Sequence, residues 1–176
     1  MTDIFVYDLY PEKTSALIEK LREVIPHVRL HQGATVEELL QQTQVVVTAA
    51  TSSEPVLPDK EELLAGKHFV AIGSYKPNMR ELPRALFNLV KVVYIDTDQA
   101  LKESGDLIVP LKNHWVVEDQ IMKLGRFLAE KGAKDETEQE TTLLKSVGMA
   151  LFDVCASKLI YERAVQKNLG QEIFFQ

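Results

Sequence analysis

Residues 1–21 read MTDIFVYDLYPEKTSALIEKL, and they indicate the class of fold. The apolar run over Asp3–Tyr7 predicts a short buried strand, and Asp8 places a carboxylate at the end of that strand. Pro11 suits the first turn of a following helix, whose apolar residues recur on one face: Leu17, Leu21 and Val24. This order is typical of the second strand of a dinucleotide-binding unit, although only two residues precede it.

The composition is that of an ordinary globular chain. Its 176 residues are 45% hydrophobic, which is enough for one domain with a substantial core. No apolar run approaches the roughly 18 residues that span a bilayer, and no basic segment followed by an apolar one marks a secretion signal. Cys155 is the single cysteine and lies in an apolar helical pattern, where we expect a buried and inert thiol. Because it cannot form an internal disulfide, it favours a cytoplasmic protein.

Charge and motif content argue against several kinds of partner. The chain carries 20 basic and 26 acidic residues, for a net charge of −6, and has no basic cluster, so nucleic acid is not the expected partner. We predict no metal site, because the histidines show no paired ligand spacing: His27, His31, His68 and His114. The chain also contains no G-x-S-x-G motif, phosphate-binding loop or EF-hand loop.

Apolar runs alternate with helical patterns along the chain, which predicts an α/β fold with a mostly parallel sheet. The runs are short and continuous, as in strands that are buried on both faces. We expect strands at Asp3–Tyr7, Val28–His31, Val45–Ala49, Phe69–Gly73 and Val92–Ile95.

Local start and stop signals predict helices between these strands. Thr35 and Glu38 form one capping box, and Asn78 and Glu81 are spaced for a second. The stretch PDKEELLAG (58–66) predicts a short helix, with Gly66 just past its end.

Two further helices are expected in the second half of the chain. The first covers Glu118–Lys131, and the second covers residues 143–168, LLKSVGMALFDVCASKLIYERAVQKN. The acidic stretch between them, GAKDETEQE (132–140), predicts an exposed loop. Because the last helix is apolar over most of its circumference, we expect the sheet, another domain or a second subunit to cover it.

The residues that follow each strand are the candidates for a site, because ligands of an open parallel sheet bind beyond the carboxyl ends of its strands. Asp8 could accept both hydrogen bonds of an adenosine ribose and repel a 2′-phosphate, which favours NAD over NADP. A helix-capping or simply exposed aspartate is the alternative. The stretch TAATSSEPVL (48–57) offers hydroxyl groups at Thr48, Thr51 and Ser52, with an ordinary polar turn as the alternative.

The fourth predicted strand runs into AIGSYKP (71–77). Gly73 permits close approach of a ligand, Ser74 can form a hydrogen bond, and Tyr75 adds a ring and a hydroxyl. This loop could contact a nicotinamide or a substrate, or it could merely turn toward the next helix.

Four segments together resemble the ornithine cyclodeaminase and mu-crystallin family. They are IFVYDLYPEKTSALIEKL (4–21), VVVTAATSSEPVL (45–57), AIGSYKPNMREL (71–82) and TLLKSVGMALFDVCASKLIYERA (142–164), of which the last two are the most specific. The resemblance covers nearly the whole chain. It implies a Rossmann domain that holds NAD(P), an N-terminal substrate domain that supplies the dimer contact, and hydride transfer on amino acids or cyclic imines.

The resemblance also implies the residues of a site. The expected cofactor contacts are Asp8, Thr48, Thr51, Ile72, Gly73, Ser74 and Ser146. Val147 is expected near the substrate, and Tyr75 occupies the substrate-side position at which cyclodeaminases have a proton-moving aspartate.

Two substitutions argue against true ornithine cyclodeamination. Tyr75, with an ordinary pKa of roughly 10, is a poor base at neutral pH, and Met79 replaces a family lysine, although Arg80 is adjacent. Imine reduction and amino-acid dehydrogenation stay open, because hydride transfer is mostly the chemistry of the cofactor.

A larger departure concerns the parts of the family that the chain does not match. The match begins at the second Rossmann strand, so the substrate domain with its arginine and lysine, the first strand and the G-x-G-x-x-G turn have no counterpart. In the strand order 3-2-1-4-5-6 the first strand is central. We therefore expect Asp3–Tyr7 and Val45–Ala49 either to pair with each other or to leave a gap that another chain fills.

We predict that residues 1–176 form a single NAD(P)-binding Rossmann-like domain with a parallel sheet, flanking helices and a long C-terminal helix. The predicted function is that of part of an NAD(P)-dependent oxidoreductase acting at the α-carbon of an amino acid or cyclic imine. The isolated chain is expected to bind NAD weakly and to catalyse poorly. The alternatives are a non-catalytic binding module and one half of a split enzyme. We expect a homo-oligomer, with the last helix in its interface, or a partner chain that supplies the missing half.

Overall fold

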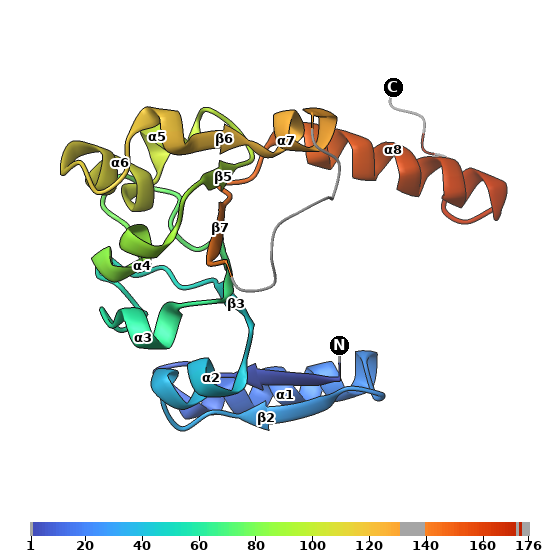
Figure 1. Cartoon of the computed structure of the whole chain (residues 1–176). Helices are drawn as coiled ribbons and strands as arrows, with labels where there is room; N and C mark the ends of the chain where they lie inside the picture. Colours follow the sequence, from blue (N-terminus) through green and yellow to red (C-terminus); the bar gives the residue numbers. More distant parts are fainter. Residues whose placement is uncertain (1, 131–139, 172, 174–176) are drawn as a thin grey trace.

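The computed structural model describes residues 2–130, 140–171 and 173 (Figure 1). Its strands are β1 (Asp3–Val6), β2 (Arg29–Gln32), β3 (Val45–Thr48), β4 (His68–Ala71), β5 (Val93–Ile95), β6 (Ile121–Lys123) and β7 (Thr142–Lys145). Its helices are α1 (Pro11–Val24), α2 (Val36–Gln42), α3 (Glu61–Leu64), α4 (Arg84–Leu89), α5 (Ala100–Glu103), α6 (Gly105–Lys112), the 3-10 turn η1 (Glu118–Gln120), α7 (Leu124–Glu130) and α8 (Ala150–Gln166). The predicted α/β architecture with a long C-terminal helix is confirmed.

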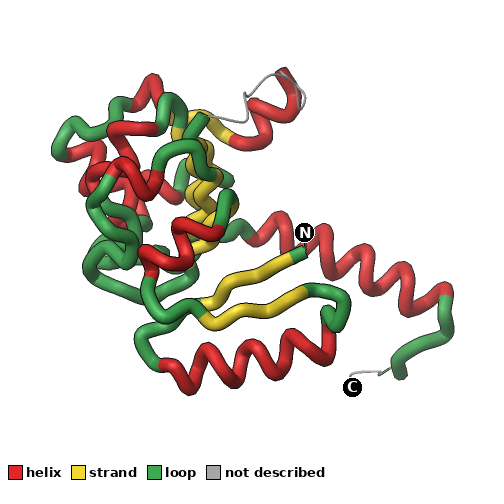
Figure 2. Tube along the Cα trace, turned by 60° about the horizontal axis from the view of Figure 1, so that its bottom comes forward, coloured by secondary structure: helices red, strands yellow, loops and turns green. Residues whose placement is uncertain are grey.

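The strands form two separate parallel sheets. One contains β1 and β2, and the other has the order β3-β4-β7-β5-β6. Among the described residues, β1 pairs only with β2, and β3 does not pair beyond β4. The two edges expected to flank the central Rossmann strand therefore do not pair with each other. Figure 1 shows β1, α1 and β2 apart from the larger sheet, and Figure 2 shows α1 running alongside β1 and β2.

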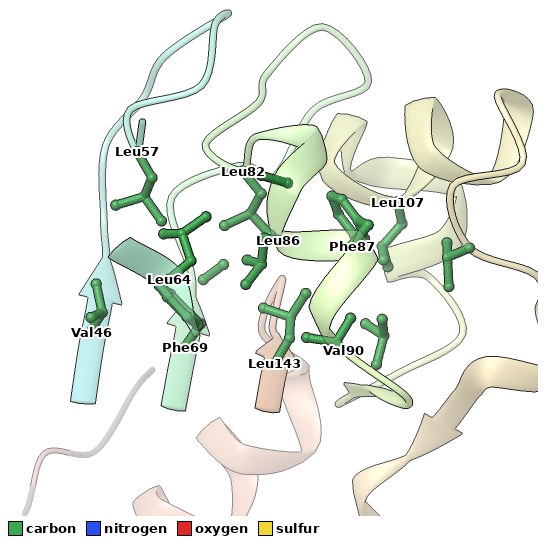
Figure 3. Packing of buried hydrophobic residues seen from close by; sticks show 14 of the residues in the cluster. Val46, Leu57, Leu64, Phe69, Leu82, Leu86, Phe87, Val90, Leu107 and Leu143 are labelled. Atoms are coloured by element: carbon green, nitrogen blue, oxygen red, sulfur yellow. The ribbon is translucent and has the colours of Figure 1, made fainter. Parts of the chain in front are cut away.

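One face of the larger sheet is covered by helices and forms the core. Alternate residues of neighbouring strands point into it, as Val46, Phe69 and Leu143 do in Figure 3. They meet Leu64 of α3 and Leu86 of α4, both fully buried. This packing fixes the positions of β3, β4 and β7 relative to one another, and so places the residues that follow these strands.

On the opposite face of the larger sheet, the edge formed by β3 is exposed. Val45 and Val47 of β3 are 58% and 59% exposed. Beside them is a hollow of about 160 Å³, lined by His68, Phe69, Val70, Tyr94, Leu124, Phe127, Thr142, Leu143 and Leu144. Parallel sheets are normally covered on both faces, so an edge that the described residues leave exposed is unusual for the fold.

The helix predicted over residues 143–168 begins later than expected, and this is the main correction. Residues Thr142–Lys145 form β7, which lies in the middle of the larger sheet between β4 and β5. Leu143 and Lys145 are buried while Leu144 is only half-buried, which is the alternation of a strand. Gly148, in the left-handed conformation with φ of 80°, separates this strand from α8.

Residues 118–131 also differ from the helix predicted there. They contain η1, the edge strand β6 and only then the short helix α7. Ile121 and Met122 are half-buried where β6 pairs with β5. Three residues are too few for a strand period to stand out against the helical spacing of Ile121, Leu124 and Leu128.

The start and stop signals were correct in the first half of the chain. Pro11 opens α1, and the Thr35 side chain caps α2 by accepting the N–H of Glu38. Gly66, with φ of 70°, follows the end of α3. The second capping box was wrong, because α4 begins at Arg84 and Glu81 has another role.

Three further expectations concern exposure. The buried residues of α1 are Thr14 and Ile18, whereas Leu17 and Val24 are exposed. Cys155 is exposed on α8, so the expectation of a buried thiol was wrong. The predicted acidic loop lies almost wholly outside the described residues, which resume at position 140.

No helix within the described ranges is long and apolar enough to cross a membrane.

Candidate functional site

The carboxyl ends of β3, β4, β7 and β5 lie along one edge of the larger sheet, because these strands are parallel neighbours in that order. We call this edge, with the loops that follow the four strands, the strand-end edge. It gathers most of the predicted site residues: Thr48, Thr51, Ile72, Gly73, Ser74, Tyr75, Ser146 and Val147. Asp8 follows β1 and therefore belongs to the other sheet.

Glu81 joins the first two loops of the strand-end edge. Its carboxylate accepts the backbone N–H of Ala50 at 2.6 Å, and those of Gly73 and Ser74 at 2.7 and 3.1 Å. Ala50 follows β3, whereas Gly73 and Ser74 follow β4. Since Glu81 is fully buried, its carboxylate is a fixed internal bridge between the two loops.

The same contact explains Gly73. A Cβ atom at this position would lie 2.3 Å from the carbonyl oxygen of Ala50 and 2.4 Å from Glu81 Oε1. The two loops therefore approach each other too closely for any residue with a side chain.

Ser74 is held from two sides. Its hydroxyl donates to the Met79 carbonyl oxygen at 2.7 Å and lies 2.8 Å from the hydroxyl of Ser104. Ser74 is fully buried, so its hydroxyl braces the loop and is not exposed to a ligand.

Asp96 joins the other two loops. It follows β5, and its Oδ2 atom accepts the hydroxyl of Ser146 at 2.7 Å and the N–H groups of Val147 and Gly148 at 3.1 and 2.9 Å. The N–H of Ser146 donates to Ala71 at the end of β4. Each of the four strand ends is therefore tied to its neighbour by a carboxylate or a main-chain bond.

A buried ion pair lies beneath the loops. Asp106 Oδ1 accepts the N–H groups of Glu81 and Leu82, and its Oδ2 atom lies 3.8 Å from Lys145 Nζ. Lys145 also donates to the Ala71 carbonyl oxygen at 3.1 Å. Burial raises the pKa of Asp106 and lowers the pKa of Lys145, and the opposite charge of each partner works against that shift.

Four of the remaining predicted residues are exposed, whereas Thr48 is not. Thr51, Ile72 and Tyr75 are exposed, and Asp8 is exposed with its Oδ1 atom accepting the N–H of Tyr10. Thr48 is buried, and its hydroxyl has no hydrogen-bond partner among the described residues. No group of three or more metal-ligating side chains occurs in the part of the chain that the structure describes.

Sequence reasoning missed four residues of this edge: Glu81, Asp96, Asp106 and Lys145. Each of the four has at least one partner far away in the sequence, for example Ala50 for Glu81, 31 residues apart. The one available signal was an acid directly after a strand, which Asp96 shares with Asp8.

Comparison with known proteins identifies the family. The profile of the ornithine cyclodeaminase/mu-crystallin family matches residues 1–168. The chain belongs to this family. A Delta(1)-pyrroline-2-carboxylate reductase of Bacillus cereus is 34% identical over 174 residues, which are 98% of this chain and 53% of the relative. The ketimine reductase mu-crystallin of Mus musculus is 35% identical over 130 residues, or 73% of this chain and 38% of the relative.

A solved family structure has the same fold. The Delta(1)-pyrroline-2-carboxylate reductase of Thermococcus litoralis, in complex with NADH and L-proline, superimposes with a TM-score of 0.87 at 27% identity. The match covers 98% of this chain and 53% of that one. The chain therefore spans about half the length of the family members most similar to it among those compared, and the resemblance seen in its sequence is confirmed.

Proposed function

We propose that this chain is the dinucleotide-binding part of a family reductase, and that the strand-end edge receives the nicotinamide half of NAD. The observation that carries the proposal is the joining of four strand ends into one braced edge by Glu81, Asp96 and the Ser146–Ala71 main-chain bond. A similar protein that superimposes over nearly the whole of this chain is known in complex with NADH. We also propose that residues 1–176 form a single NAD(P)-binding domain.

The residues present suit a dinucleotide. The buried hydroxyl of Thr48 is a polar group without a partner among the described residues, and the exposed Thr51 lies three residues further on. Asp8 would accept hydrogen bonds from the adenosine ribose and disfavour a 2′-phosphate, which makes NAD the preferred cofactor over NADP. Ile72, Gly73 and Ser146 would contact the nicotinamide half, and the fully buried Ser74 would brace the loop beneath it.

The proposed reaction is hydride transfer at the α-carbon of an amino acid or cyclic imine, for which bound nicotinamide supplies or accepts the hydride. Exposed Tyr75 and the half-buried Val147 would lie on the substrate side. Tyr75 can donate a hydrogen bond but is a poor base, which favours imine reduction over cyclodeamination. The names of the bacterial and mammalian relatives, both reductases of imines, agree with this choice.

We propose further that a strand from another polypeptide segment completes the fold. The N–H of Arg29 donates to the Thr2 carbonyl oxygen, so this carbonyl group points toward β2, the partner of β1. In the same way, the N–H of His68 donates to the Gln44 carbonyl oxygen, which points toward β4, the partner of β3. By alternation, the main-chain groups of Phe5 and Val45 face the opposite, unpaired edges. Exposed Val45 and Val47 and the adjoining apolar hollow give the same segment a surface to cover.

Self-association through α8 is the second way to cover apolar surface. Every residue of this helix except Ala164 is exposed, including large apolar ones: Leu151, Phe152, Val154, Leu159, Ile160, Tyr161 and Val165. An apolar surface of this kind is typical of an interaction site. Light scattering should show a mass that rises with concentration, and a monomer at high concentration would contradict this part of the proposal.

A non-catalytic binding module is the second candidate function, and the substitution at Tyr75 favours it. Adding a substrate domain from a related reductase distinguishes the two candidate functions. The resulting complex should reduce cyclic imines if the chain is part of a reductase, and should not do so if the chain is a non-catalytic binding module. A cytoplasmic location suits either function and rests on the lone Cys155.

Nuclear magnetic resonance can test the proposed site even if binding is weak. We expect millimolar NADH to shift the amide signals of Gly73, Ile72 and Ser146, together with those around Asp8. Inorganic pyrophosphate at the same concentration should not reproduce the shifts at Gly73 and Ser146. Shifts confined to other parts of the chain would overturn the proposal, and micromolar affinity would contradict the expectation of weak binding.

A further inference from the structure

Glu81 is a buried acid whose hydrogen-bond partners are main-chain amides of two different loops. Both oxygens accept, Oε1 from Ala50 and Oε2 from Gly73 and Ser74. This is the pattern of a deprotonated carboxylate, which only accepts. Hydrogen bonds to a charged acceptor are about twice as strong as neutral ones, so the two loops are held firmly.

The three amides lie among the proposed cofactor contacts. Ala50 stands between Thr48 and Thr51, and Gly73 follows Ile72. A carboxylate that fixes Ala50 and Gly73 therefore fixes the main chain at the proposed contacts on both loops. Arg80 N–H adds a bond to the Ser52 carbonyl oxygen at 2.8 Å, so the segment around Glu81 is bonded to the first loop at more than one point.

Glu81 is itself held in place. Its own N–H donates to Asp106 Oδ1 at 2.8 Å, and its carbonyl oxygen accepts the N–H of Val56 at 2.9 Å. Asp106 is nearly fully buried and faces the buried Lys145. The main chain that carries the carboxylate is therefore fixed both by the first loop, through Val56, and by the buried Asp106 of α6.

We propose that Glu81 is a positioning residue for the nicotinamide half of the dinucleotide, acting through the main chain at Ala50, Gly73 and Ser74. This inference rests on the proposed function. Pre-organised loops reduce the ordering cost of binding, so the contribution of Glu81 should appear as affinity. It should be specific to the nicotinamide half, because Asp8 belongs to the separate β1–β2 sheet and does not bond to Glu81 among the described residues.

The experiment compares NADH with ADP-ribose, which lacks the nicotinamide. Glu81→Gln keeps the size of the side chain but turns one accepting oxygen into an N–H₂ donor that faces main-chain donors. We expect this variant to bind NADH about tenfold more weakly and ADP-ribose within twofold of the unchanged chain. The NADH-induced shifts at Gly73 should disappear. Glu62→Gln, on the exposed side of α3, is the matched control and should change neither affinity.

Equal weakening of both ligands, or no weakening of either, would overturn the inference while the unchanged chain still shows the NADH shifts. If NADH causes no such shifts in the unchanged chain, the proposed function is overturned instead. If Glu81→Gln does not fold, hydrogen exchange of the amides in the unchanged chain tests the inference. The amides of Ala50 and Gly73 should be protected before NADH is added, and free exchange at both would contradict pre-organised loops.

Discussion

Ser146 Oγ donates a hydrogen bond to Asp96 Oδ2 over 2.7 Å, and this bond joins the carboxyl ends of the two neighbouring strands β7 and β5. The same oxygen accepts the N–H groups of Val147 and Gly148. Asp96 thus links the ends of β5 and β7, as Glu81 links the loops that follow β3 and β4.

Replacing Asp96 should loosen the loop after β7. In Asp96→Asn an N–H₂ group competes for the place of the accepting oxygen, so part of this set of bonds is lost. We expect the free energy of unfolding to fall by about 1–3 kcal/mol, measured by urea denaturation. The control Asp98→Asn removes an exposed ion pair with Lys123 and should change stability by less than about 1 kcal/mol. Equal effects of the two variants would argue against the bracing role of Asp96.

The close approach of two loops makes Gly73 intolerant of a side chain. Gly73→Ala puts a Cβ atom 2.3 Å from the Ala50 carbonyl oxygen, so one of the loops must move. We expect a loss of about 1–3 kcal/mol or more in thermal or chemical denaturation. Gly125→Ala in α7 is the comparison, because nothing lies within 4 Å of its added Cβ and alanine favours a helix. A well-tolerated Gly73→Ala would mean that the loops are further apart than described.

Asp8 should set the choice between the two nicotinamide cofactors. Its carboxylate repels a 2′-phosphate, so the unchanged chain should bind NADH more tightly than NADPH. In Asp8→Asn the charge is lost, and the ratio of the two affinities should shrink by roughly tenfold. Parallel titrations followed by protein fluorescence measure the ratio. An unchanged ratio would place the adenosine ribose elsewhere.

The β1–β2 sheet should lose stability in acid through Asp3. Arg29 donates to both carboxylate oxygens of Asp3 at 2.7 and 2.6 Å, and this pair, with His31, lowers the pKa of Asp3. A lowered folded-state pKa gives stabilisation that is complete above the unfolded-state value and is lost as the pH falls through the folded-state value. Asp3→Asn should therefore be less stable than the unchanged chain at pH 7, and the difference should narrow below about pH 4. Urea denaturation at several pH values measures it, and a gap that widens in acid would contradict the pairing.

The sequence predicted the alternation of strands and helices well but predicted the centre of the sheet poorly. Continuous apolar runs such as Val45–Thr48 stand out between turn signals, so the first strands were found. The strand β7 was hidden because four residues of period two adjoin the long apolar α8. A strand partner from a distant part of the chain, here β4, leaves no local trace.

The residues of the candidate site also fall into those that the sequence predicted and those that it did not. Family resemblance found the residues on the loops, but the bracing carboxylates were missed because their partners are distant in sequence. Glu81 is spaced three residues after Asn78, which reads as a capping box, yet its hydrogen bonds reach Ala50, 31 positions earlier. Tertiary contacts at the strand-end edge overrode the local signal.

A crystal structure of the chain grown with excess NADH tests the central claim most directly. The account predicts the nicotinamide ring against Gly73 and Ser146 at the strand-end edge, with the adenosine ribose at Asp8. Loops braced by Glu81 and Asp96 should keep their bonds in that structure. Well-ordered NADH bound away from this edge would contradict the account.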